Sequence, residues 1–189
     1  MYSPTIPRHI LSKTTFLYGC QCVKRLWLHK FMPEVRDEED EAQTAIFQRG
    51  TNVGLIARQL FPGGVDASPV NAYSYQKSVA DTARYIGLGH TIIYEAAFQY
   101  DGILCAIDIL VKKNNKWHAY EVKSTCSVKP QHIQDAAFQY YVLTHTGIEL
   151  EDFFIVILIM NMSVQCIGYK QAIYSRICIK RGERTSNIY

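Results

Sequence analysis

The pattern of hydrophobic and polar residues changes character at about residue 90. Before that point, apolar residues recur at spacings of three and four, which is the period of a helix with one buried face. Glycine and proline residues mark where these periodic segments stop. Three helices are predicted here: one capped by Ser12 with apolar positions from Phe16 to Trp27, one over 39–60, and one over 75–86. Residues 10–61 are therefore expected to form an N-terminal helical part.

After residue 90 the pattern predicts mainly strands. Two turn signals, Asp101-Gly102 and Asn114-Asn115, separate runs of alternating apolar residues. The predicted elements are strands over 90–100, 103–112 and 116–123, a helix over 131–146, and a strand over 153–160. The last strand is apolar on both faces, which is typical of a central sheet strand. The order β-β-β-α-β implies an α/β fold with a mixed central sheet flanked by helices.

Length and composition indicate one folded domain. The chain has 189 residues, of which 48% are apolar and 20% charged, so extensive disorder is not expected. We expect 1–189 to be a single domain with a helical part at 10–61, a core at 90–161 and an irregular tail at 162–189. The net charge is only +3, so charge alone does not indicate a nucleic-acid partner.

The sequence contains no segment typical of a membrane span or a secretory signal. Its most apolar run, 153–160, is eight residues long, whereas a membrane helix needs about 20. The first ten residues hold two prolines and no apolar stretch. We therefore expect a cytoplasmic protein without a membrane partner, whose six cysteines are reduced rather than paired.

The two turns determine which residues of the three strands face each other. If Asp101-Gly102 forms the first loop, facing residues have numbers that sum to 203, and Glu95 lies opposite Asp108. If Asn114-Asn115 forms the second loop, the sum is 229, and Asp108 lies opposite Glu121. Three acids from adjacent strands should then line up on one face, unless an odd loop or a bulge intervenes.

Carboxylates aligned in this way need charge compensation. They must take up protons or share a cation, and hard oxygen ligands select Mg²⁺ or Mn²⁺. Lys123 lies two residues beyond Glu121 and so points to the same face. Such a set suits phosphodiester hydrolysis, because the metal activates a water and the lysine orients or deprotonates it. The alternative is that Glu121 and Lys123 face solvent and that Asp108 pairs with a nearby lysine.

The helix over 131–146 carries a polar stripe. His132, Asp135 and Gln139 are spaced by three and four, so they share one face. This stripe could line a cleft at the end of the sheet, or it could be the exposed face of an amphipathic helix. The spacing is equally compatible with both.

Several of these residues also occur together as a pattern. The central part of the pattern is, in order, Ile107-Asp108, Glu121-Val122-Lys123 and Gln139-Tyr140-Tyr141. Four further segments precede it: Leu11-Ser12-Lys13-Thr14, Cys22-Val23-Lys24-Arg25-Leu26, Arg49-Gly50 and Tyr94-Glu95-Ala96-Ala97-Phe98. This pattern resembles the PD-(D/E)xK nuclease superfamily, and more specifically its RecB-type exonuclease branch. That branch includes the CRISPR-associated exonucleases and a group of uncharacterised bacterial RecB-like proteins. The resemblance covers roughly Ile10 to Asn161.

The resemblance implies a restriction-endonuclease-like core and a role for each matched residue. The implied catalytic residues are Asp108, Glu121, Lys123 and Gln139, and the implied metal ligands are Asp108, Glu121, the main-chain carbonyl of Val122, and Glu95 as an accessory acid. Lys123 would be the catalytic lysine, and Gln139 would contact the site or the DNA backbone. The implied activity is exonuclease-like, Mg²⁺- or Mn²⁺-dependent hydrolysis of DNA, in repair, recombination or defence.

The chain departs from the family pattern at two positions near the site. The branch often has a metal-binding histidine shortly after the glycine of its early helix, but 51–54 offer none, which makes Glu95 a candidate replacement. A tyrosine usually follows the glutamine motif by one turn, where this chain has Leu143. The missing histidine, together with the irregular tail, favours an alternative function, a catalytically silent module that binds nucleic acid or a partner protein.

Many relatives also hold an iron–sulfur cluster through one early and three late cysteines. Cys20 and Cys22 are early enough, but only Cys166 and Cys178 are late, and their spacing is loose. We therefore expect buried or incidental cysteines rather than a cluster. For a DNA partner, single- or double-stranded, the candidate phosphate contacts are Lys24, Arg25, Arg49 and Lys129.

Overall fold

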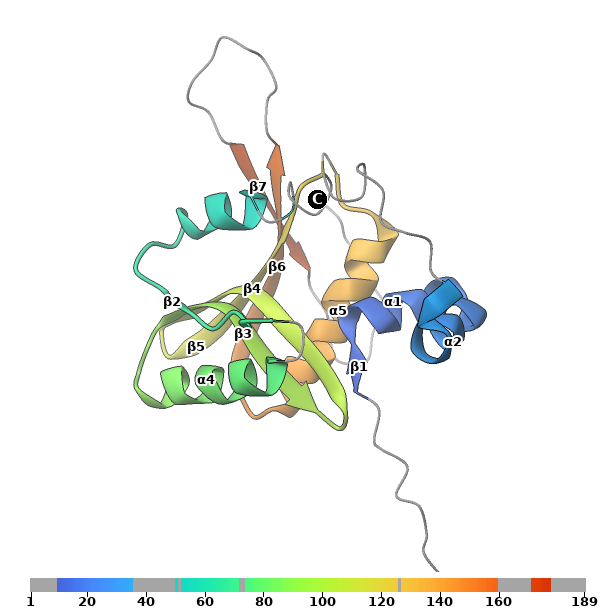
Figure 1. Cartoon of the computed structure of the whole chain (residues 1–189). Helices are drawn as coiled ribbons and strands as arrows, with labels where there is room; N and C mark the ends of the chain where they lie inside the picture. The colour runs from blue at the N-terminus through green and yellow to red at the C-terminus, as the bar shows by residue number, and fades with distance from the viewer. Residues whose placement is uncertain are drawn as a thin grey trace, which may run out of the picture.

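The computed structural model describes residues 10–35, 50, 52–71, 74–125, 127–159 and 171–177. This part of the chain is an α/β fold, as predicted, with helices packed against a mixed seven-stranded sheet (Figure 1). The strands are β1 (Leu11–Ser12), β2 (Val65–Asp66), β3 (Ile92–Tyr100), β4 (Ile103–Lys113), β5 (Lys116–Lys123), β6 (Leu150–Ile159) and β7 (Gln171–Ile177). The helices are α1 (Lys13–Gln21), α2 (Val23–Phe31), η1 (Pro33–Val35), α4 (Tyr75–Gly87) and α5 (Pro130–His145), with a further helical stretch at 52–58. None of the described helices is long and apolar enough to cross a membrane.

The sheet has the predicted β-β-β-α-β segment at its centre. Its strand order is β2-β3-β4-β5-β6-β7, and β1 pairs with β4. The β3–β4 and β4–β5 pairs are antiparallel, whereas α5 connects β5 to a parallel β6. Facing residues sum to 203 in the first hairpin, as in Ile93↔Leu110, and to 229 in the second, as in Ile109↔Tyr120. The register computed from the two turns is therefore confirmed.

The β3–β4 ladder is interrupted where two of the acids lie. Glu95 and Asp108 face each other by number but do not form a ladder pair, and Glu95 has a φ of 53°. In a regular strand, side chains that point to the same face are an even number of positions apart. Ile93 and Ala96 are three positions apart and yet belong to the same core cluster, so the alternation of faces shifts by one residue at Glu95. Directly opposed like charges would be costly in a regular sheet. The expected continuous row of directly opposed acids is therefore wrong. Instead, β3 and β4 are both irregular at Glu95 and Asp108.

Helical segments cover both faces of the sheet. α5 contributes Ala136, Phe138, Val142 and Leu143 to the larger core cluster, and the ring of Phe16 on α1 stacks on that of Phe138 with centroids 4.6 Å apart. On the other face, Val53 and Ala57 of the 52–58 helix pack against Tyr94, Ile109 and Tyr120. The acids therefore lie between α1 and α5 on one side and the 52–58 helix on the other.

The N-terminal helical part differs from the prediction of one long first helix. The chain forms two helices, α1 and α2, because Cys22 is extended, with φ −165° and ψ 121°. The N–H of Cys22 ends α1 by donating to the carbonyl of Tyr18, and its own carbonyl accepts from the N–H of Leu26 in α2. In α2, the apolar residues that recur at three and four positions do not form a buried face, because Val23 and Trp27 are exposed. Of the helix predicted over 39–60, residues 50 and 52–58 are helical, whereas 36–49 and 51 lie outside the described residues.

The tail was predicted to be irregular, and this is wrong for one segment. β7 pairs with β6 as an antiparallel strand, with Ile157 opposite Ile173. The rest of the predicted tail, 162–170 and 178–189, lies outside the described residues. This strand has only seven residues, which mix polar and apolar types, so it is too short to show a clear alternation in the sequence alone.

Candidate active site

Asp108 and Val122 meet where the β4–β5 ladder ends. The last pair of the ladder on this side is Ile109↔Tyr120. Beyond it, the main-chain N–H of Val122 donates to Oδ2 of Asp108 at 2.6 Å. A side-chain carboxylate thus replaces the next ladder partner. This contact fixes the orientation of Asp108 beside the neighbouring strand.

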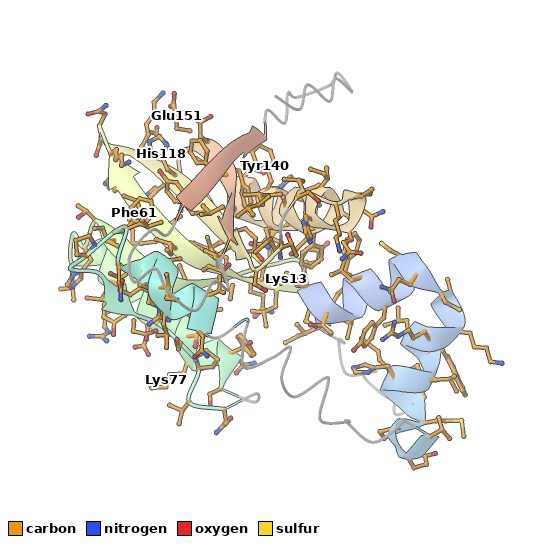
Figure 2. The ribbon with its side chains drawn as sticks, turned by 90° about the horizontal axis from the view of Figure 1, so that it is seen from above. Lys13, Phe61, Lys77, His118, Tyr140 and Glu151 are labelled. Atoms are coloured by element: carbon orange, nitrogen blue, oxygen red, sulfur yellow. The ribbon has the colours of Figure 1, made fainter. Side chains whose placement is uncertain are left out.

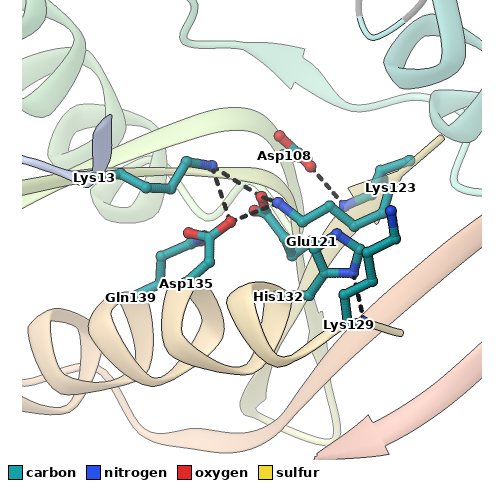
Figure 3. Close-up of polar contacts among 9 residues, drawn as sticks. Lys13, Asp108, Glu121, Lys123, Lys129, His132, Asp135 and Gln139 are labelled. Atoms are coloured by element: carbon teal, nitrogen blue, oxygen red, sulfur yellow. Dashed lines mark hydrogen bonds and ion pairs between the residues drawn. The ribbon is translucent and has the colours of Figure 1, made fainter. Parts of the chain in front are cut away.

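Glu121 is buried and is held by two lysines. Its side chain is 1% exposed, and its Oε1 accepts from Nζ of Lys123 at 2.7 Å and from Nζ of Lys13 at 2.8 Å (Figure 3). Within the described part of the chain, its other oxygen, Oε2, is buried without a hydrogen-bond partner. Burying an unpartnered carboxylate oxygen is costly. This oxygen is therefore a candidate ligand for a cation.

The polar stripe of α5 faces the sheet, which settles the choice left open by the sequence. Oδ2 of Asp135 lies 2.5 Å from Nζ of Lys123 and 3.7 Å from Nζ of Lys13. Oδ1 of Asp135 accepts from Nε2 of Gln139 at 2.8 Å. His132 is also buried, and its Nδ1 accepts from the N–H of Lys129 at 3.1 Å. The stripe is thus the inner wall of a site and not an exposed helix face.

Gln139 supports this wall from behind. It is 0% exposed, and within the described residues its side chain forms a hydrogen bond only with Asp135. Its burial leaves no surface for a direct contact with a DNA backbone. Within this structure, Gln139 orients Asp135, which in turn contacts both lysines.

Glu95 lies at the rim of the site rather than in its centre. Its Oε1 is 3.7 Å from a guanidinium nitrogen of Arg58, the last residue of the helical stretch 52–58, which also pairs with Asp66 at 2.6 Å. A cavity of about 640 Å³ connects these residues: Lys13, Arg58, Glu95, Asp108, Glu121, Val122 and Lys123 all line it. The three acids predicted to align therefore share one cavity, although they do not form one regular row.

The cavity wall has open space on its helical side. Gly50 and Gly54 line it, and a Cβ at either glycine would meet no atom of the described residues within 4 Å. A second cavity, of about 520 Å³, lies on the other side of Lys123 and reaches Gln21 at the end of α1. Lys123 is therefore accessible from two directions, and the acids have room for a ligand beside them.

Burial and charge set the protonation of the two central acids in opposite directions. Burial, together with the neighbouring carboxylates of Glu121 and Glu95, raises the pKa of Asp108 to about 8. Burial would also raise the pKa of Glu121, but the ammonium groups of Lys13 and Lys123 lower it to about 2. Burial would lower the pKa of Lys123, yet Glu121 and Asp135 raise it. Glu121 and Lys123 are thus charged, whereas Asp108 forms no ion pair within the described residues and feels only the more distant charge of Lys13.

These donors fit a Mg²⁺ or Mn²⁺ ion. Within the described residues, no group of three or more His, Cys, Asp or Glu side chains forms a ready-made metal site. Mg²⁺, however, is commonly held by one or two carboxylates and otherwise by waters and substrate oxygens. The unpartnered Oε2 of Glu121 and the carboxylate of Asp108 supply such a pair. A soft-metal site is not indicated by this all-oxygen set.

Sequence reasoning missed Lys13 as a site residue. It lies at the start of α1, 108 positions before Glu121, and reaches the carboxylates from beside the sheet (Figures 2 and 3). The capping residue Ser12 was recognised, and its Oγ accepts from the N–H of Thr15 at 3.3 Å. A lysine directly after a helix cap could have been noted as a side chain that the helix start holds in place. Nothing in its spacing indicated the acids as its partners.

The other candidate residues are placed less centrally. Lys24, Arg25 and Lys129 are exposed, and Arg49 lies outside the described residues. Arg25 packs over the ring of Tyr18 at 4.1 Å. Cys20 and Cys22 are exposed free thiols and Cys105 is a buried one, whereas 126, 166 and 178 lie outside the described residues. In comparisons with known proteins, no family model matches the chain, and no curated protein matches it either.

Proposed function

We propose that this protein is a metal-dependent nuclease that hydrolyses phosphodiester bonds of DNA. The observation that carries the proposal is the arrangement of Asp108, Glu121 and Lys123 around one cavity, with an unpartnered carboxylate oxygen on Glu121. Two hairpins bring these residues together in a register that their turns determine. The proposal includes a restriction-endonuclease-like core, of the RecB-like type that the sequence pattern resembles.

The carboxylates of Asp108 and Glu121, with the main-chain carbonyl of Val122, would hold Mg²⁺ or Mn²⁺. A bound ion would polarise a phosphoryl oxygen and lower the pKa of a water. Asp108 is oriented for this role by the N–H of Val122, and Glu121 by the two lysines on its other oxygen. Glu95 would act as an accessory acid at the rim of the cavity.

Lys123 would stabilise negative charge at the scissile phosphate. Its neighbours Glu121 and Asp135 raise its pKa and so favour the ammonium form. An ammonium donates hydrogen bonds and offsets charge, whereas a base must first lose its proton. We therefore assign Lys123 to orienting the attacking water and the phosphate oxygens, and not to abstracting a proton. Gln139 would act through Asp135, which positions this ammonium.

A second candidate function is a silent module that binds nucleic acid or a partner protein. The observation that favours it is the closed set of contacts among Lys13, Lys123, Glu121 and Asp135, which neutralise one another without a metal. Such a module would not need the unpartnered oxygen of Glu121.

Cleavage of DNA by the purified full chain tests the proposal. Single- and double-stranded DNA are incubated with the protein in Mg²⁺, in Mn²⁺ and in EDTA, beside a Lys123→Ala variant. The proposal predicts cleavage that needs the metal and falls at least about 100-fold in the variant. Binding of DNA without cleavage would instead support the silent module. Cleavage that the substitution leaves unchanged would contradict the assignment of the site.

A further inference from the structure

Two ammonium groups share the same two carboxylate oxygens in this site. Nζ of Lys123 lies 2.7 Å from Oε1 of Glu121 and 2.5 Å from Oδ2 of Asp135. Nζ of Lys13 lies 2.8 Å from the same Oε1 and 3.7 Å from the same Oδ2. Figure 3 shows the two lysines converging on this pair of acids from different elements. A carboxylate that bridges two cations is also a feature of two-metal nuclease sites, where the two ions are about 3.5–4 Å apart.

The two oxygens of Glu121 therefore have different surroundings. Oε1 is occupied by both lysines, whereas Oε2 is buried without a partner in the described part of the chain. Asp108 lies in the same cavity and is tied to the N–H of Val122. A divalent ion between Asp108 and Oε2 would leave the lysine contacts in place. A second ion on Oε1 would have to displace Lys13.

The charges around the cavity indicate the same stoichiometry. The carboxylates of Glu121 and Asp135 are paired with the ammonium groups of Lys13 and Lys123, and Arg58 is paired with Asp66. Among the described residues that line the cavity, Asp108, with Glu95 at the rim, remains to offset the charge of one divalent cation. A second divalent cation would leave buried positive charge uncompensated, which is costly.

We propose that Lys13 takes the place of a second divalent cation, so that this site binds one metal ion per chain. The inference rests on the proposed nuclease function, because it concerns the metal of that site. Lys13 acts as a positioning residue: it neutralises Oε1 of Glu121 and Oδ2 of Asp135 and leaves Oε2 to the metal. Its place at the start of α1 makes the N-terminal segment part of the site.

Metal stoichiometry measured without any substrate tests this inference. The full chain is titrated with Mn²⁺, and free Mn²⁺ is counted by its electron paramagnetic resonance signal. The variants are Lys13→Met, which removes the charge, and Lys13→Arg, which keeps it. Lys77→Met is the matched control, because Lys77 forms an exposed ion pair with Asp81 on α4, away from the site. Asp108→Asn reports whether the bound ion belongs to the proposed site.

Wild type, Lys13→Arg and Lys77→Met should each bind about one Mn²⁺ in an Asp108-dependent manner. Lys13→Met should bind a second ion, or bind the first at least about tenfold more tightly, since a neighbouring positive charge is removed. Two ions in wild type would overturn the inference, as would a Lys13→Met variant identical to wild type. If Lys13→Met does not fold, the stoichiometries of wild type and Lys13→Arg still decide between one ion and two. Absence of any Asp108-dependent Mn²⁺ binding in wild type would instead remove the proposed function itself.

Discussion

The main-chain N–H of Val122 donates a hydrogen bond of 2.6 Å to Oδ2 of Asp108, at the point where the β4–β5 ladder ends. The strand therefore continues its pairing with a side chain of its neighbour. This relationship fixes one oxygen of Asp108 and directs the carboxylate to the cavity that Glu121 and Lys123 also line. The fold thus positions Asp108, but it buries the carboxylate without an ion-pair partner among the described residues. The pH dependence of the stability of the metal-free protein follows from this burial.

Replacing Asp108 by Asn should stabilise the metal-free protein at alkaline pH. Burial and the neighbouring acids raise the pKa of Asp108 to about 8 in the folded protein, against about 3.9 in an unfolded chain. Between these values the folded state holds a proton that the unfolded state has lost, so wild-type stability falls as pH rises through this window. Asn does not titrate and still offers an oxygen to Val122.

The variant should therefore gain about 1–3 kcal/mol over wild type at about pH 9, and much less at about pH 5. Urea unfolding of both proteins in EDTA at the two pH values measures the difference. A gain of the same size at both pH values would show that the titration of Asp108 is not its cause. The lowered pKa of Glu121 affects stability only in more acidic solution, as the pH falls toward about 2.

Binding of a divalent ion should stabilise the folded protein through the same acids. An ion at 100 times its dissociation constant adds about 2.7 kcal/mol to the free energy of unfolding, if it binds only the folded state. Thermal unfolding with and without Mn²⁺ measures this gain, with NaCl of equal ionic strength as the control. Glu121→Gln should lose most of the gain, because the unpartnered Oε2 of Glu121 is the proposed ligand. An equal gain in wild type and variant would place the ion elsewhere.

Gln139→Leu should reduce activity more than it reduces stability. The substitution removes the hydrogen bond from Nε2 of Gln139 to Oδ1 of Asp135, and also an amide oxygen that has no partner within the described residues. Losing the hydrogen bond destabilises the fold, whereas removing the unpartnered oxygen stabilises it, so we expect the free energy of unfolding to fall by only about 1 kcal/mol. Asp135 and Lys123 would be held less firmly, and cleavage should slow about tenfold.

Gln99→Leu is the matched control, because Gln99 is exposed on β3 and lines neither of the two cavities beside Lys123. Comparing rates and urea unfolding of the two variants separates positioning from folding. Equal rates for wild type and Gln139→Leu would mean that Gln139 only fills space in the core.

The strand register and the central acids could be predicted from the sequence because they depend on local signals. Asp101 and Asn114 adopt positive φ values of 44° and 49°, which their turns require and their residue types favour. Counting outward from these turns gives the register of both hairpins, which brings Glu95, Asp108 and Glu121 to one cavity although no two of these acids form a ladder pair. The irregularity at Glu95 could not be predicted by counting, because the positive φ of Glu95 has no signal in either turn.

The remaining parts of the site depend on tertiary packing. Periodicity placed Asp135 and Gln139 on one face of α5, but a helix with both polar and apolar stripes does not reveal which face meets the sheet. Lys13 reaches Glu121 across 108 positions because Phe16, one turn later on α1, stacks on Phe138 of α5. The extended Cys22, which separates α1 from α2, has no distinguishing residue type.

The rate of Mn²⁺-dependent DNA hydrolysis by Asp108→Asn, measured beside wild type and Lys77→Met, tests the central claim most directly. The Asn variant preserves the shape of the side chain and the acceptor for Val122, so it removes a metal ligand with little change to the fold. All three proteins are purified in parallel, which exposes any contaminating nuclease. We predict that Lys77→Met cleaves like wild type and that Asp108→Asn is slower by at least about 100-fold. Equal cleavage by Asp108→Asn and wild type, or no metal-dependent cleavage by folded wild type, would contradict the account.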